Sequence, residues 1–232
     1  MTITEDAVIS ELLPHARPED RWIIDTILNQ AGYRRALDIR PGDVLLDLGA
    51  HVGACVAFAL QEGAEHVVAV EMLPATVDIL RRHFATDPRV TIVPAAVAAE
   101  SRNGTAVTRR FSNPMGASIS EWNAHARNGV TVPTVTLAGL LAGYQPTKLK
   151  IDIENAEYEI LGINGIDALT ASPVQRVAAE LHIANRDTVA EARRVISMMR
   201  VAGWTSSRDT EAEPYAGPTK PSGWHMRIAW HR

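Results

Sequence analysis

The segment VLLDLGAHVGA, residues 44–54, joins an apolar run to an acidic residue and two glycines, a pattern typical of nucleotide-binding loops. A dinucleotide fingerprint needs glycine at a first, third and sixth position, and here those positions hold Gly49, His51 and Ala54. The middle glycine is missing, so pyrophosphate binding is poorly supported. No Gly-Lys-Ser/Thr follows, which also excludes a phosphate-binding P-loop. The loop therefore favours a cofactor without phosphates.

The remaining features of the loop suit a nucleoside with a charged amino-acid tail. Asp47 precedes the turn, Gly49 allows it to be tight, and Gly53 allows a close approach. Glu71 ends the next apolar run, roughly twenty residues after Gly49, the usual place for a carboxylate that binds both ribose hydroxyls. Each feature alone fits an ordinary strand–helix turn equally well. Together they favour S-adenosyl-L-methionine (SAM) as the cofactor.

A second group of chemically active residues lies in KLKIDIENAEYEIL and in the later run AAELHIAN. Side chains alternate across a strand, so Lys150, Asp152 and Glu154 are expected on one side, with Lys150 as an ion-pair partner for the acids. Glu180 and His182 end the second run, two positions apart. Ligands of open α/β sheets bind beyond the carboxyl ends of the strands, so these side chains are expected to converge on one pocket.

These residues suit proton transfer and acceptor orientation. His182 is a candidate general base because imidazole titrates near neutral pH, while Asp152 or Glu154 can orient an acceptor or bind the cofactor's ammonium group. Acids also favour helix N-termini in solvent; this interpretation is adopted for Glu159 and left open for Glu157. Mg²⁺ would accept such oxygen ligands, but the spacing defines no octahedral site, and no metal is predicted.

Short apolar runs alternate with helical patterns along the chain, which predicts a parallel α/β sheet. The expected strands cover 43–49, 66–71, 90–93, 148–153 and 174–181, and the expected helices cover 53–62, a segment from Pro74, and 187–201. Apolar residues alternate in 224–230, which predicts a last, antiparallel strand. Residues 211–223 are expected to form a loop. We expect an N-terminal helical cap over 1–40 and one domain over 41–232, with an insertion at 100–136.

Composition excludes several classes of protein. The chain has 232 residues, 46% hydrophobic and 22% charged, as in one ordinary globular domain. A net charge of −4 argues against a nucleic-acid partner. The single cysteine excludes an internal disulfide and a thiolate metal cluster. No apolar run is long enough to span a membrane and the N-terminus is too polar for a signal peptide, so a cytoplasmic protein is expected.

Four motifs in order, LLDLGAHVGA, VVAVEMLP, LKIDIENAEYEIL and AAELH, resemble the FkbM-type methyltransferase family over residues 30–200. The resemblance implies a Rossmann-like, seven-stranded methyltransferase sheet, mostly parallel with an antiparallel last strand, and SAM-dependent transfer to hydroxyl groups of sugars or natural products. The implied cofactor residues are Asp47, Gly49, Ala50, His51, Gly53, Glu71, Met72 and Asp152. Asp152 would lie where cofactor and acceptor meet.

Two positions depart from the family pattern, which usually has glycine at Asn155 and proline at Met72. Because Asn155 is next to the expected reaction site, a non-catalytic module that binds SAM or S-adenosylhomocysteine stays an alternative, as does a nicotinamide-dependent oxidoreductase. The acceptor is expected to be a small hydroxylated molecule. Residues that line its pocket, or form only a polar hairpin, are Ser118, Ser120, Trp122 and His125. Whether the chain forms a homo-oligomer is left open.

Overall fold

The structure is a computed structural model that describes most of the chain. The described residues are 13–20, 24, 31–100, 105–107, 130–183, 186–206, 211–215 and 223–232. The expected cap over 1–40 is described only in part, by a 3₁₀ turn η2 (Pro18–Asp20) and helix α3 (Ala31–Leu37). The candidate acceptor residues Ser118, Ser120, Trp122 and His125 lie outside the described residues.

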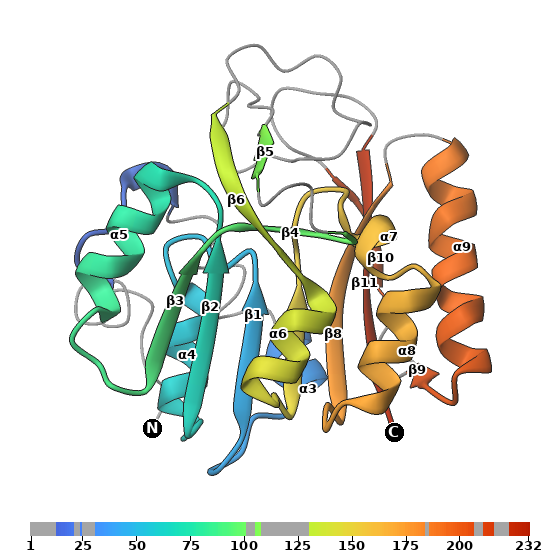
Figure 1. Ribbon diagram of the computed structural model, residues 1–232, viewed down its shortest axis with the longest axis horizontal. Helices are drawn as coiled ribbons and strands as arrows, with labels where there is room; N and C mark the ends of the chain where they lie inside the picture. The colour runs from blue at the N-terminus through green and yellow to red at the C-terminus, as the bar shows by residue number, and fades with distance from the viewer. Residues whose placement is uncertain are drawn as a thin grey trace.

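One large sheet organises the described part of the chain (Figure 1). Its strands are β1 (Val44–Leu48), β2 (His66–Glu71), β3 (Val90–Pro94), β7 (Lys148–Ile151), β8 (Arg176–Ile183), β9 (Thr205–Ser206), β10 (Glu211–Tyr215) and β11 (Gly223–His231). The order is β10-β11-β8-β7-β1-β2-β3, with β9 paired to β11. Strands β8, β7, β1, β2 and β3 are parallel, and β11 runs antiparallel to β8. The fold class expected from the sequence is confirmed.

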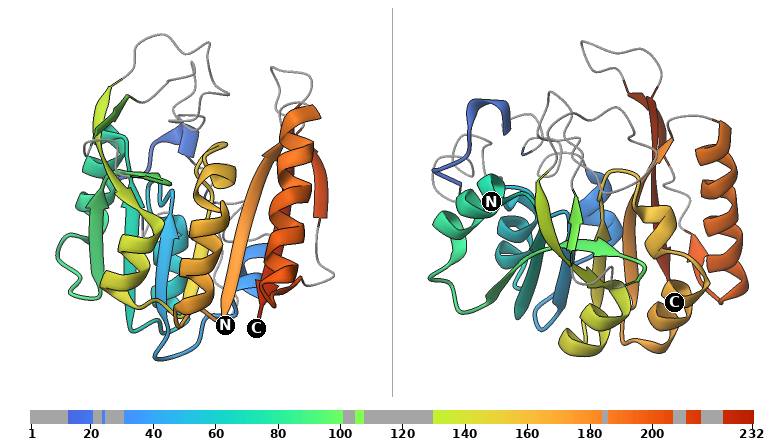
Figure 2. Two further views of the ribbon diagram at one scale, coloured as in Figure 1. Left: turned by 45° about the vertical axis from the view of Figure 1, so that its right-hand side comes forward. Right: turned by 45° about the horizontal axis from the view of Figure 1, so that its top comes forward.

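Helices cover both faces of this sheet (Figure 2). They are α4 (Ala54–Gln61), α5 (Pro74–Phe84), α6 (Leu137–Tyr144), α7 (Glu157–Ile160), α8 (Ile163–Ala171) and α9 (Arg186–Val201). Leu46 and Leu48 of β1 pack into one apolar core with α6, α8 and α9, while Leu45 packs into a second core with α3, α4 and α5. This alternation explains why β1 is apolar along almost its whole length: both of its faces are buried.

A small second sheet stands beside the large one. It contains β4 (Ala96–Ala98), β5 (Thr105–Val107) and β6 (Thr131–Thr136) in the order β4-β6-β5. Strand β6 pairs in parallel with β4, so the end of the expected insertion returns to the main body of the protein. Thr136 then caps α6, because its hydroxyl oxygen accepts a hydrogen bond from the Gly139 N–H at 3.1 Å.

One prediction about the C-terminal region is wrong. Residues 211–215, expected as part of a loop, form β10, which pairs antiparallel with β11. The segment EAEPY is polar and contains a proline, which disguises a strand. Such residues are tolerated here because β10 lies at the edge of the sheet and pairs on one side. Within the described residues, no helix has the length and apolar character needed to cross a lipid bilayer.

Candidate active site

The site lies where the chain direction across the sheet reverses, between β1 and β7. From β1 the chain runs outward through β2 and β3 on one side, whereas β7 and β8 follow on the other. Gly49 ends β1 with φ +80°, and a Cβ there would lie 1.8 Å from the backbone oxygen of Asp152. Only glycine permits this approach. The loop after β1 and the segment after β7 are therefore in direct contact.

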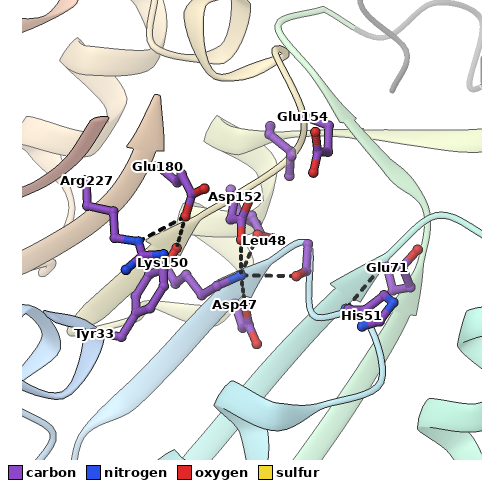
Figure 3. A network of polar contacts seen from close by, with 12 residues as sticks. Tyr33, Asp47, Leu48, His51, Glu71, Lys150, Asp152, Glu154, Glu180 and Arg227 are labelled. Atoms are coloured by element: carbon purple, nitrogen blue, oxygen red, sulfur yellow. Dashed lines mark hydrogen bonds and ion pairs between the residues drawn. The ribbon is translucent and has the colours of Figure 1, made fainter. Parts of the chain in front are cut away.

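Glu71 links this loop to the end of β2. One carboxylate oxygen, Oε2, accepts the His51 N–H at 3.0 Å, and the other, Oε1, accepts the Leu73 N–H at 2.8 Å (Figure 3). The side chain is buried, and burial raises the pKa of Glu71 although these backbone donors oppose the rise. A carboxylate has about four lone-pair positions, so Glu71 can still accept a hydrogen bond from a ribose.

Gly53, at the end of the loop after β1, lies close to α5. It precedes α4 with φ +97°, and a Cβ would lie 2.3 Å from the Phe84 ring and 2.8 Å from Leu80, both on α5. The close approach expected from the sequence is thus to α5. It fixes how closely the helix that follows β1 packs against the helix that follows β2.

Lys150 is buried beneath the loop and is the ion-pair partner that the sequence predicts. Its Nζ lies 3.1 Å from Asp47 Oδ1 and 3.7 Å from Asp152 Oδ2, and it donates a hydrogen bond to the Gly49 carbonyl oxygen at 3.0 Å (Figure 3). Burial alone would lower the pKa of Lys150, but the carboxylates of Asp47 and Asp152 raise it above its usual value. Lys150 therefore stays protonated and joins the cofactor loop to Asp152.

The N-terminal segment reaches the same loop. Asp20 is fully buried, is held by Arg17, and its Oδ1 lies 3.4 Å from His51 Nε2. Burial nevertheless lowers the pKa of His51 to about 4, so the ring is neutral at physiological pH. No sequence signal pointed to Asp20, because an acid in a polar segment gives no indication of burial.

His182 is surrounded by acidic side chains that follow β7 or lie near the end of β8. Its Nε2 lies 3.5 Å from Glu154 Oε2, 3.9 Å from Asp152 Oδ1 and 3.9 Å from Glu180 Oε1. Its Nδ1 lies 3.1 Å from Oε1 of Glu157, which also accepts the Ile153 N–H at 2.9 Å. The expected convergence of Asp152, Glu154, Glu180 and His182 is observed. Glu157 is fully buried, so the solvated alternative left open for it is wrong.

The crowding of acids changes the acid–base properties of this group. Burial alone would lower the pKa of His182, but Glu154, Glu157 and Glu180 raise it well above the usual value. Burial raises the pKa of Glu154 to about 8; the positive charge of His182 opposes this rise, and the neighbouring acids add to it. The surrounding acids therefore favour the protonated, cationic form of His182.

Tyr33 and Arg227 complete the cluster, although no sequence pattern pointed to either residue. The Tyr33 hydroxyl donates to Glu180 Oε2 at 3.2 Å, and Arg227 Nε lies 3.3 Å from the same oxygen (Figure 3). Arg227 is placed by the pairing of β11 with β8, which sets it directly opposite Glu180. Tyr33 comes from α3, far away in the sequence. Only the three-dimensional fold reveals these contacts.

The turn after β7 explains the unusual Asn155. Glu154 and Asn155 have φ values of +58° and +77°, in the left-handed region. Asparagine tolerates this conformation better than most residues other than glycine, so Asn155 can replace the glycine usual in the family. Its side-chain oxygen is buried and has no hydrogen-bond partner among the described residues. Met72, the other departure, packs against a small apolar cluster that includes Ala96 and Ala156.

One solved structure, with a TM-score of 0.50, agrees with this architecture. Magnesium protoporphyrin IX methyltransferase from Synechocystis PCC 6803, solved with bound SAM, matches with a TM-score of 0.50 and 14% identity, covering 91% of this chain and 78% of that one. Precorrin-6y C5,15-methyltransferase from Geobacter metallireducens GS-15 matches with a TM-score of 0.45 and 15% identity, covering 85% of each chain. A search of curated protein sequences gives no match.

The family comparison is more specific. The model of the methyltransferase FkbM domain matches residues 47–203, which include both the loop after β1 and the acid cluster. This match covers well over half of the chain and confirms the resemblance inferred from the motifs. The chain therefore belongs to the FkbM methyltransferase family.

Proposed function

We propose that the protein transfers the methyl group of SAM to a hydroxyl group of a small molecule, such as a sugar or another hydroxylated natural product. The cofactor is S-adenosylmethionine. One observation carries the proposal: the loop held by Glu71 and the cluster around His182 lie next to each other, through the contact of Gly49 with Asp152. A cofactor held by Glu71 would therefore have an acidic, histidine-containing group next to it.

The chemistry is an in-line displacement at the methyl carbon. A lone pair of the acceptor oxygen forms the new C–O bond while the C–S bond breaks, and the electron pair passes to the sulfonium sulfur. The products are the methyl ether and S-adenosylhomocysteine, and the acceptor's proton must pass to a base. Alignment of the reacting atoms accounts for much of the acceleration expected in such a site, up to about 7–11 kcal/mol in favourable cases.

Glu154 is the base that the geometry favours. Asp152 contacts Lys150, Glu157 accepts the Ile153 N–H, and Glu180 contacts Arg227. Glu154 instead contacts His182 at 3.5 Å, and 30% of its side chain is exposed, more than for the other members of the cluster. It is thus the most accessible acid of the cluster, and in its ionised form it can take up a proton. Asp152 is assigned to orienting the acceptor.

A single-turnover assay tests the proposal. SAM carrying a labelled methyl group is mixed with the enzyme and a panel of sugars and hydroxylated metabolites, and label in methyl ethers is measured. Glu154→Gln is expected to slow transfer by about 10²-fold or more, the usual contribution of a general base, with little change in the Kd of S-adenosylhomocysteine. Glu159→Gln, on α7, is the control. Equal rates for Glu154→Gln and the native protein would exclude Glu154 as the base; transfer only to amines would refute O-methylation.

A further inference from the structure

We infer that Asp152, Glu180 and His182 form a binding site for a divalent metal ion, held beside the reacting methyl group. One ligand atom from each side chain lies within 4.8 Å of the others. Ligands about 2.1 Å from an ion lie about 3.0 Å apart in an octahedron and about 3.4 Å apart in a tetrahedron. The two distances from His182 Nε2, each 3.9 Å, exceed these values by less than about 1 Å. Side-chain rotations that shorten these separations, none of which exceeds 4.8 Å, would close the site around an ion.

In each of the two carboxylates, the oxygen that would not bind the ion already contacts a neighbouring side chain. Asp152 directs Oδ2 toward Lys150 and Oδ1 toward His182. Glu180 directs Oε2 toward Arg227 and Tyr33, and Oε1 toward His182. One oxygen of each carboxylate is thus held by a neighbouring donor, which leaves the other oriented to the same point. This arrangement is typical of metal ligands, whose outer contacts fix their orientation.

His182 is oriented in the same way. Glu157 is fully buried, and its Oε1 lies 3.1 Å from Nδ1 while also accepting the Ile153 N–H. A proton held on Nδ1 by Glu157 leaves the lone pair of Nε2 facing Asp152 and Glu180. The carboxylate–histidine pair is a recurring support for metal-bound imidazole.

Charge also favours a cation at this point. Four carboxylates surround His182, whereas Lys150 is shared with Asp47 and the Gly49 carbonyl, and Arg227 contacts one of the four. Buried negative charge is costly, and a divalent ion would add positive charge among these acids. One imidazole with carboxylate oxygens suits Mn²⁺, Zn²⁺ or Mg²⁺ rather than a soft ion such as Cu(I).

The role of the ion rests on the proposed function. An acceptor hydroxyl that coordinates the ion loses its proton more readily, because the metal stabilises the oxyanion. Glu154 remains outside the three ligands and can take up this proton. The metal site would therefore position the acceptor oxygen and activate it, while Glu71 holds the cofactor.

Mn²⁺ binding tests the inference without any need for methyl transfer. The protein is stripped with EDTA, dialysed and titrated with MnCl₂, and free Mn²⁺ is measured by electron paramagnetic resonance. We expect about one bound ion per chain, and a loss of affinity of at least about 10-fold in Asp152→Asn and in Glu180→Gln. Glu159→Gln, an acid outside the cluster, should bind Mn²⁺ as the native protein does. Circular dichroism shows that each variant is folded.

The outcomes separate the metal site from the proposed function. Absence of Mn²⁺ binding, or binding equal in Glu180→Gln and in the native protein, would overturn the metal site. Methyl transfer that continues at an unchanged rate in EDTA would overturn the role of the ion in transfer and leave the methyltransferase function intact. Bound Mn²⁺ together with no transfer to any hydroxylated acceptor would support the metal site and contradict the proposed function.

Discussion

Glu71→Ala gives a direct test of how the cofactor is held. Glu71 accepts two backbone N–H groups, one on each oxygen, from His51 and Leu73. A carboxylate has about four lone-pair positions, so the side chain can still accept hydrogen bonds from the ribose hydroxyls. Hydrogen bonds to charged groups are among the stronger ones, and loss of this pair is expected to weaken cofactor binding by about 1–3 kcal/mol. This corresponds to a rise in Kd of about 5- to 150-fold.

The measurement is isothermal titration calorimetry with S-adenosylhomocysteine. The substitution also leaves the N–H groups of His51 and Leu73 without their acceptor, so a loss of affinity alone does not prove contact with the ribose. The 2′-deoxy analogue of the ligand resolves this. In the native protein its affinity should be lower than that of the parent ligand, whereas in Glu71→Ala the two should bind nearly alike. Glu65→Ala, in an exposed residue just before β2, is the control.

The double comparison isolates the contact of Glu71 with the hydroxyl, because effects on the loop are common to both ligands. A coupling energy above about 0.5 kcal/mol would identify a direct interaction. An equal penalty for the 2′-deoxy ligand in the native and variant proteins would show that the ribose is held elsewhere. The cofactor orientation assumed here, and with it the position of the methyl group, would then have to be abandoned.

Three further predictions concern stability and the departures from the family pattern. Gly53→Ala should lower the free energy of unfolding, measured by urea denaturation, by about 2–4 kcal/mol. Gly42 also has a positive φ but no atom near the added Cβ, so Gly42→Ala should lower it by only about 1–2 kcal/mol. Equal losses would contradict the packing argument. Asn155→Gly should retain methyl transfer, since glycine fits φ +77°, and a 10-fold loss by radiometric assay would instead implicate the amide. Lys150→Met should lower the free energy of unfolding, measured by urea denaturation, by about 3–5 kcal/mol, because it leaves Asp47 buried without its ion-pair partner. The double variant Lys150→Met/Asp47→Asn should recover most of this loss. No recovery would refute the pairing.

The main sheet could be predicted because its central strands have a recognisable local pattern in the sequence. In β1, β2 and β7 both faces are buried, so these strands are short apolar runs, and the glycine or acid that ends each run marks its position at the edge of the sheet. Strand β10 lacked such a signal. As an edge strand it pairs on one side and accommodates Pro214, which made the segment resemble a loop.

The residues of the site could be predicted better than their partners. Glu154 and His182 were expected together because each follows a neighbouring parallel strand. Glu157 could not be assigned, because an acid in the first turn of a helix is favoured there by the helix dipole whether it is buried or exposed. Arg227 depends on the pairing of β11 with β8, and Tyr33 on the packing of α3, and neither is encoded in a local pattern.

Lys150 shows why the two halves of the site should respond to each other. Its single ammonium group contacts Asp47 at the end of β1, the Gly49 carbonyl in the cofactor loop, and Asp152 in the acid cluster. The group is nearly completely buried, so water cannot replace any of these contacts without opening the core. A change in the charge of Asp152 therefore changes the balance of contacts that hold Gly49. Cofactor and acceptor sites that share one buried cation in this way cannot be perturbed independently, and binding on one side should alter affinity on the other.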